Sequence, residues 1–177
     1  MLVAVLAVHT HADGLLSVLA PLGLGAAAGT ALVLDLDPSG VQLPSPTTVA
    51  EMISASPTLD QLRPTRSGLA VLASGGAAWD AGSELVEALG RNWPAVVVKV
   101  AEPVPLATVP VRPLMPGVAP SMTPAVYQQT GLPGGRAGEG IVLPRPGGRV
   151  IRQLMAGQAS RGKWVRSWRA VWRRPWS

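Results

Sequence analysis

The sequence predicts an α/β fold: a small Rossmann-like parallel sheet with helices on both faces, followed by a proline-rich arm and a C-terminal basic helix. Short apolar runs alternate with stretches of helical composition over the first hundred residues. These runs are apolar at nearly every position, which is typical of parallel strands covered on both faces. At 177 residues with 47% hydrophobic residues, the chain is long enough to bury one compact core.

The first strand and helix are predicted from the opening 27 residues. Residues 2–8 form a continuous apolar run rich in β-branched side chains, so we expect a buried strand. Residues 14–27 are rich in Leu and Ala and favour a helix. Pro21, Gly23 and Gly25 weaken its second half, because each lowers helix propensity.

The next elements follow the same alternation. We expect strands over residues 31–36, 68–73 and 95–100, a helix capped by Thr47 or Thr48 that runs to Ser54, and a helix that starts at Asp80 or Ser83 and is ended by Gly90. Ligands in such sheets usually lie beyond the carboxyl ends of the strands.

The composition changes after Glu102, with ten prolines from Pro103 to Pro146. Residues 109–114 predict a fifth, edge-like strand, because Pro110 and Pro113 cannot donate to a central ladder. The pattern beyond it indicates an irregular arm and then an interrupted helix. The predicted division is an α/β domain (1–118), a Pro/Gly-rich arm (119–148) and a basic Trp-rich tail (149–177).

Composition and charge exclude several classes of protein. The chain has no cysteine, which excludes a disulfide framework and a cysteine zinc site. No segment approaches the roughly 20 apolar residues of a membrane span, and the opening run lacks the basic start of a signal peptide, so we expect a cytoplasmic protein. Residues 1–100 hold eight acids and four bases, whereas residues 101–177 hold two acids and eleven bases. This asymmetry indicates that the C-terminal part meets an anionic partner.

Three segments, in this order and spacing, carry a resemblance to a known family. They are "LVLDLDPSG" at residues 32–40, "SGLAVLASGG" at 67–76 and "NWPAVVVKV" at 92–100. Over roughly residues 1–115 the chain resembles the MinD/ParA family of deviant P-loop ATPases, including its CpaE-like members. The resemblance implies a P-loop-like fold, with Asp35 and Asp37 matching the family's functional acids.

The chain departs from that family at both ATP-binding motifs. After the first strand, "HTHADGLLSVLA" offers one glycine, Gly14, and no lysine where the family has a glycine-rich, lysine-bearing phosphate loop. Lys99 stands where the magnesium-associated Asp would fall. A cation there opposes metal binding, and catalysis of phosphoryl transfer depends on charge stabilisation. We therefore expect a degenerate module without cofactor or ATPase activity; weak nucleotide binding through Gly14, Asp35 and Asp37 is the alternative.

A second alternative is a metal site at the end of the first strand. His9, His11 and Asp13 resemble the opening of metal-dependent hydrolases, and alternation along a strand puts both histidines on one side. However, these are the only two histidines of the chain, and such enzymes use more ligands. Polar loop residues at the rim of the sheet are the favoured interpretation.

The C-terminal segment combines aromatic and basic residues at helical spacing. Trp164, Trp168 and Trp172 recur every four residues and form one stripe, and Pro175 ends the helix. The basic residues occupy the rest of the helix: Lys163, Arg166, Arg169, Arg173 and Arg174. Such a helix suits an anionic membrane surface or an acidic protein partner, with nucleic acid less favoured. Alternatively, the tryptophan stripe docks on the domain itself.

These observations together predict a non-catalytic MinD/ParA-like scaffold or regulator. By resemblance, its setting is pilus assembly, secretion or septum placement. It engages a partner, or the inner membrane face peripherally, through its tail, and a homodimer is left open.

Overall fold

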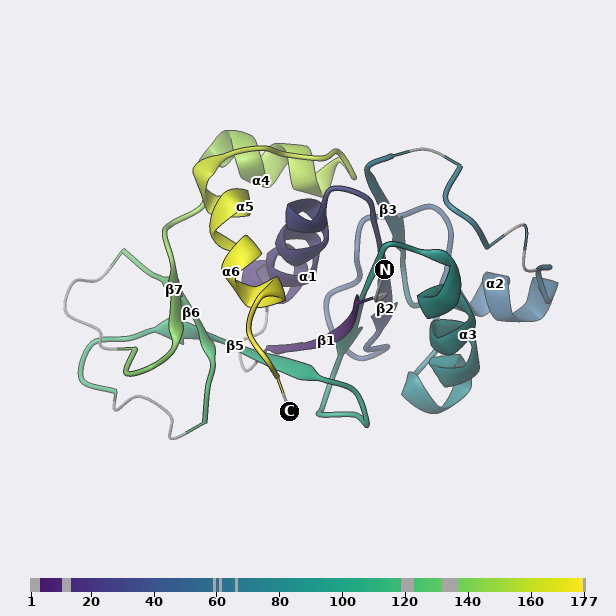
Figure 1. Ribbon diagram of the computed structural model, residues 1–177, viewed down its shortest axis with the longest axis horizontal. Coiled ribbons are helices and arrows are strands. Elements are labelled where there is room, and N and C mark those ends of the chain that lie inside the picture. Colours follow the sequence, from purple (N-terminus) through teal and green to yellow (C-terminus); the bar gives the residue numbers. More distant parts are fainter. Residues whose placement is uncertain are drawn as a thin grey trace.

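All strands belong to one parallel sheet, which confirms the predicted fold class. The computed structural model describes residues 4–10, 14–58, 60, 62–65, 67–118, 123–131 and 137–176 (Figure 1). Its seven-stranded sheet has the order β3-β2-β4-β1-β5-β6-β7, and every neighbouring pair is parallel. The strands are β1 (Ala4–Thr10), β2 (Ala31–Leu36), β3 (Leu69–Leu72), β4 (Ala95–Val100), β5 (Thr108–Leu114), β6 (Val126–Gln129) and β7 (Ile141–Leu143).

Helices cover both faces of the sheet, as the sequence predicts. The helices are α1 (Leu15–Ala28), α2 (Val49–Ala55), α3 (Trp79–Asn92), α4 (Gly148–Met155), α5 (Lys163–Ser167) and α6 (Arg169–Trp172). Helices α1, α4, α5 and α6 pack on one face, and α2 and α3 pack on the other (Figure 1). Strands β2 and β4 are buried at every residue, which explains their uninterrupted apolar sequences.

Two of the predicted helix boundaries depend on capping residues. Thr48 caps α2 in a reciprocal capping box with Glu51, whose side chain accepts from the Thr48 backbone N–H at 2.9 Å. The prediction that Gly90 ends α3 is wrong, because the helix continues to Asn92. Gly90 instead allows a close approach to β1: a Cβ atom at this position would lie 3.0 Å from Val5 Cγ2.

Strand β5 is an interior strand, so the prediction of an edge strand is wrong. The Ala107 carbonyl accepts from the Ala7 amide, so backbone groups of odd-numbered β5 residues face β1 and those of even-numbered residues face β6. Pro110 therefore faces the β6 side before the ladder with β6 begins at Val111. Pro113 faces the β1 side and lies beyond Val111, the last β5 residue paired with the described part of β1. Pro110 therefore removes no ladder hydrogen bond.

The segment predicted as an irregular arm contributes two further strands. Strands β6 and β7 extend the same sheet, and Val126 and Leu143 are fully buried in the core beneath the C-terminal helices. The prolines that suggested an arm lie outside these strands, at positions such as Pro124 and Pro144. Strand β6 has four residues and β7 has three, at or below the lower limit of the runs of about four to eight residues from which a strand is usually predicted.

Glycines in α1 allow the C-terminal helices to pack closely. A Cβ atom at Gly23 would lie 2.5 Å from Trp164 Cη2 and 2.6 Å from Trp168 Nε1, and one at Gly25 would lie 2.6 Å from Val33 Cγ2. These glycines lower helix propensity, as predicted, yet α1 is one helix of 14 residues. Tertiary packing on both of its sides outweighs that local cost.

None of the helices in the described ranges is long and apolar enough to cross a membrane.

Candidate functional site

Asp35 and Lys99 form a buried pair at the carboxyl edge of the sheet. Each is the only charged residue of its strand, and the parallel register of β2 and β4 places them side by side. Both point toward the α1 face, since Val33 and Val97, two residues earlier on each strand, pack in the core cluster with α1. The side chain of Asp35 is 0% exposed and that of Lys99 is 3% exposed.

The Lys99 ammonium is bonded within a closed network. Its Nζ atom lies 3.1 and 3.2 Å from the two carboxylate oxygens of Asp35, 2.8 Å from the Val41 carbonyl oxygen and 3.3 Å from Asp37 Oδ2. The Asp35 carboxylate also accepts from the backbone N–H groups of Asp37 and Leu43, both at 3.0 Å. Every donor and acceptor of this buried pair therefore has a protein partner.

Asp37 holds the turn that follows β2. Its Oδ1 atom accepts from the Gly40 amide at 2.9 Å and the Ser39 hydroxyl at 3.1 Å. These bonds are those of a turn in which an Asp side chain mimics the backbone, as the Asp-Pro-Ser-Gly sequence predicts. Because Oδ2 of the same carboxylate reaches Lys99, the turn is joined to the buried pair.

The two carboxyl groups differ in their pKa. Burial raises the pKa of Asp35 above its ordinary value, although Lys99 and the backbone donors oppose this effect. Burial alone would also raise the pKa of Asp37. Attraction to Lys99 and hydrogen bonds from Lys99, Ser39 and Gly40 outweigh burial there and lower the pKa.

This arrangement places a cation against both acids that a magnesium ion would need. Hard cations such as Mg²⁺ take carboxylate oxygens as ligands. Here an ammonium group lies within 3.3 Å of both Asp35 and Asp37. A divalent ion brought to these oxygens would meet the positive charge of Lys99 at close range, so binding would require Lys99 to leave the network.

Helix α1 starts directly after Gly14, which forms the alternative nucleotide site together with Asp35 and Asp37. Gly14 has a φ of 86°, and its carbonyl accepts from the Ser17 hydroxyl at 2.7 Å. The first turn of the helix presents Leu15, which is 51% exposed, and no basic residue. His11 and Asp13 lie outside the described residues.

His9 lies on the other face of the sheet from Asp35 and Lys99. Side chains alternate along β1, and Val8 packs in the cluster with α1. His9 therefore points away from α1, into a cavity of about 390 Å³ that Arg112 and Trp176 also line. Across the described ranges, no three His, Cys, Asp or Glu side chains gather in a geometry that could hold a metal ion.

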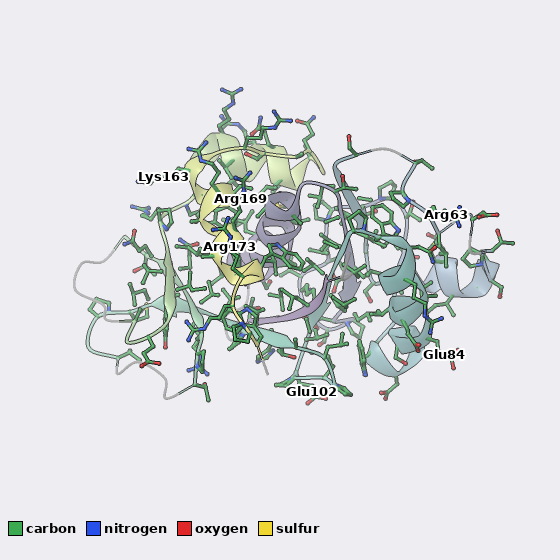
Figure 2. The ribbon with its side chains drawn as sticks, in the orientation of Figure 1. Arg63, Glu84, Glu102, Lys163, Arg169 and Arg173 are labelled. Atoms are coloured by element: carbon green, nitrogen blue, oxygen red, sulfur yellow. The ribbon has the colours of Figure 1, made fainter. Side chains whose placement is uncertain are left out.

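The tail residues divide between the core and the surface. Trp164 and Trp168 are 2% and 0% exposed. Their rings pack edge to face, with 5.6 Å between the ring centroids. The Trp164 Nε1 donates to Gln128 Oε1 at 2.7 Å, and the Trp172 Nε1 donates to the Leu24 carbonyl at 2.9 Å. The stripe thus docks on its own domain. Four of the basic residues are exposed, and Arg174 is half-buried. The exposed residues are Lys163, Arg166, Arg169 and Arg173. Figure 2 shows Lys163, Arg169 and Arg173 on the outer side of the C-terminal helices.

The sequence carries a partial signal for the Asp35–Lys99 pairing, which the strand order completes. The aspartates and the lysine were each singled out there, the aspartates as surviving acids and the lysine as a misplaced cation. The signal that joins them is that each interrupts an otherwise apolar strand near its carboxyl end. A charge buried in a parallel strand needs a partner, and the neighbouring strand supplies it.

Fold and site together define an α/β protein with an all-parallel sheet and, at its carboxyl edge, a lysine that pairs with two aspartates. Compared with known proteins, the chain matches no family model, no curated protein and no solved structure.

Proposed function

We propose that the chain is a non-catalytic scaffold or regulatory protein with the layout of a MinD/ParA-type ATPase. The observation that carries this proposal is the contact of Lys99 with both Asp35 and Asp37. In a P-loop enzyme, metal ions neutralise the phosphates and acidic side chains hold the metal. In this chain a lysine takes the place of the metal, so the acids stabilise the fold instead.

The hydrogen bonds around Asp35 support a structural role for the cluster. Leu43 and Val41 belong to the segment after β2, and their backbone groups bond to Asp35 and Lys99 respectively. The cluster therefore fixes the path of this segment across the carboxyl edge of the sheet. A metal or nucleotide that drew Asp35 away would leave buried backbone groups without partners, which costs about 1–3 kcal/mol for each.

The C-terminal basic surface supports a binding role. Its tryptophans hold the helices in place, and its arginines face outward. The expected partner is anionic, either an acidic protein or a membrane surface, in a system such as pilus assembly, secretion or septum placement. Since Trp164 and Trp168 lie in the core and Trp172 packs against it, any such partner meets a cationic surface rather than an aromatic stripe.

Isothermal calorimetry of the full chain with ATP and with ADP, each with and without Mg²⁺, tests the proposal. We expect no heat of binding and no release of phosphate. Binding of ATP with micromolar affinity in the presence of Mg²⁺ would overturn the proposal. A chain truncated at Gly157 is not a suitable control, because it lacks the core side chains Trp164 and Trp168.

A further inference from the structure

A partly enclosed cavity of about 390 Å³ lies beside the point where the chain changes its direction across the sheet. The chain leaves β1 toward β2 through α1, whereas from β5 it continues the other way to β6 and β7. Strands β1 and β5 therefore flank a topological switch point, which is where open parallel sheets usually bind their ligands. The volume of the cavity is within the range of about 300–1,000 Å³ that is usual for small-molecule sites.

The strand residues of this cavity lie on the face of the sheet away from α1. His9 pairs with Pro110 in the register of β1 and β5, and Arg112 lies two residues further along β5. Their side chains share this face, because the preceding residues Val8 and Val109 pack in the core cluster with α1. The residues of the alternative nucleotide site are not among the described residues that line the cavity. It is therefore a separate site.

Basic and apolar groups share the wall of the cavity. His9 and Arg112 supply an imidazole and a guanidinium group, and both residues are half-buried. The indole of Trp176 and four prolines supply most of the remaining wall: Pro103, Pro110, Pro124 and Pro175. No acidic side chain is among the described residues that line it. This mixture fits a ligand with a negative charge at one end and an apolar body.

The indole ring that lines the cavity is held in place by the tail. Trp176 Nε1 donates to the Val171 carbonyl at 2.8 Å, and Val171 is fully buried in the core. The Arg174 Cζ atom lies 5.6 Å from the centroid of the Trp176 ring. A ligand therefore meets an apolar surface that is already ordered, and this lowers the entropic cost of binding.

We propose that this cavity binds a small monocarboxylic acid whose apolar part packs against Trp176. The carboxylate accepts a pair of hydrogen bonds from Arg112, because the planar guanidinium fork matches its two oxygens. His9 faces the same space from the neighbouring strand and offers a second polar contact. The inference goes beyond the proposed function, since Lys99 and its two aspartates take no part in it.

The lining favours a carboxylate over a phosphate. A phosphate monoester carries a charge of about −1.5 to −2 at neutral pH and presents three strong acceptor oxygens. Among the described residues that line the cavity, Arg112 is the one that is always cationic, and most of the others are apolar. A single guanidinium group matches the charge and the two oxygens of a carboxylate.

Proton–nitrogen correlation NMR of the full chain, titrated with benzoate, tests the proposal. Each tryptophan indole N–H gives one signal, and the variant Trp176→Phe identifies the signal of Trp176. We expect millimolar benzoate to shift this signal in a saturable way, and the neutral analogue benzamide to leave it in place. Trp79 and Trp93 pack in the core cluster with α3, so their signals serve as internal controls that should not move.

The variant Arg112→Gln removes the proposed partner of the carboxylate. Its matched control is Arg63→Gln, which removes an exposed arginine from another part of the chain. We expect the affinity for benzoate to fall about tenfold or more in Arg112→Gln and to stay unchanged in Arg63→Gln, because a hydrogen-bonded charge pair is lost only in the first. Arg112→Lys keeps the charge without the planar fork and should give an intermediate affinity.

Any of four results would overturn the proposal. They are an unmoved Trp176 signal, equal responses to benzoate and benzamide, equal benzoate affinities of Arg112→Gln and Arg63→Gln, and tighter binding of inorganic phosphate than of benzoate. The comparison of benzoate with benzamide uses the unmodified chain, so it decides the matter even if Arg112→Gln does not fold. The calorimetry with ATP concerns a different site, so either proposal can fail alone.

Discussion

The two charged regions of the molecule use their charges in opposite ways. At the carboxyl edge of β2 and β4, Lys99, Asp35 and Asp37 are largely removed from water, and each charge has partners within 3.3 Å. On α5 and α6, the arginines are exposed, and none of them takes part in the ion pairs of the described residues. The first region uses its charges to stabilise the fold. In the second region the core side chains of the helices stabilise the fold, and the exposed arginine charges contribute little to it.

This contrast supports the proposal that the chain has no site for ATP. The acids on which the resemblance depends are present, but a cation from the neighbouring strand satisfies them. The positive charge that a polyphosphate would need lies elsewhere, on helices added after the sheet is complete. Substitutions that remove a buried charge, compared with substitutions that remove an exposed one, test this contrast.

The largest effect is expected from Lys99→Met. This substitution leaves Asp35 buried without its cation, and breaking a buried pair by removing one partner costs about 3–5 kcal/mol of unfolding free energy. Urea denaturation followed by circular dichroism measures the loss. Adding Asp35→Asn to the variant removes the uncompensated charge and is expected to restore part of the stability.

Arg91→Ala provides the matched control for that experiment. Arg91 pairs with Glu87 on α3, and both side chains are about two-thirds exposed. An exposed pair at this helical spacing contributes about 0.3–0.5 kcal/mol. If Lys99→Met were no more costly than Arg91→Ala, the buried network would have no structural role and the contrast between the regions would be lost.

An intermediate effect is expected from conservative changes of the two buried tryptophans. Trp164→Phe leaves Gln128 Oε1 without its indole donor, which costs about 1–3 kcal/mol beyond the loss of ring volume. Trp168 Nε1 is buried and makes no hydrogen bond with the described residues. Trp168→Phe therefore removes no hydrogen bond, and we expect it to be the milder change by about 1–2 kcal/mol in thermal unfolding. A larger loss of stability in Trp168→Phe than in Trp164→Phe would show that the tail packs differently.

The smallest effect is expected in the pH dependence of the unfolding free energy. The folded state lowers the pKa of Asp37 below that of the unfolded chain, so the unfolded state binds the proton more tightly. The stabilisation by Asp37 is thus present above the ordinary carboxyl pKa and is lost as pH falls through the lower, folded-state pKa. The pKa of Asp35 is raised, so its effect on the pH dependence of stability has the opposite sign. Asp35 is present both in the unmodified chain and in an Asp37 variant, so its effect cancels when the two are compared.

Asp37→Asn isolates the contribution of Asp37. The variant is expected to be less stable than the unmodified chain by about 1 kcal/mol at pH 6. This difference should shrink as the pH is lowered below about 4, the ordinary range for a carboxyl group. Chemical denaturation at a series of pH values measures it. A difference that grew on acidification would contradict the direction of the pKa shift.

Much of the first hundred residues could be predicted because local pattern and tertiary structure agree there. The apolar runs at 31–36 and 95–100 coincide with β2 and β4, and Thr48 caps α2 as its sequence indicates. Prediction failed where proline content dominated the pattern. Strand β5 tolerates Pro110 because this residue faces the β6 side before that ladder begins, and this depends on a register that only the assembled sheet defines.

The site was predicted in its residues but not in its connections. Asp35, Asp37 and Lys99 were each recognised from the sequence, while the pairing required the strand order that places β4 beside β2. For the tail, the amphipathic pattern predicted an apolar stripe and a basic face. It could not decide what covers the stripe, because that depends on Gly23, which lies in a distant helix and admits the tryptophan rings.

The most direct test of the central claim is an experimental structure of the chain determined with Mg²⁺ and a non-hydrolysable ATP analogue. The account predicts that Lys99 Nζ stays within hydrogen-bonding distance of Asp35 and Asp37, and that no nucleotide lies at the N-terminus of α1. A magnesium ion seated on either aspartate, with Lys99 displaced and a triphosphate beside Gly14, would contradict it.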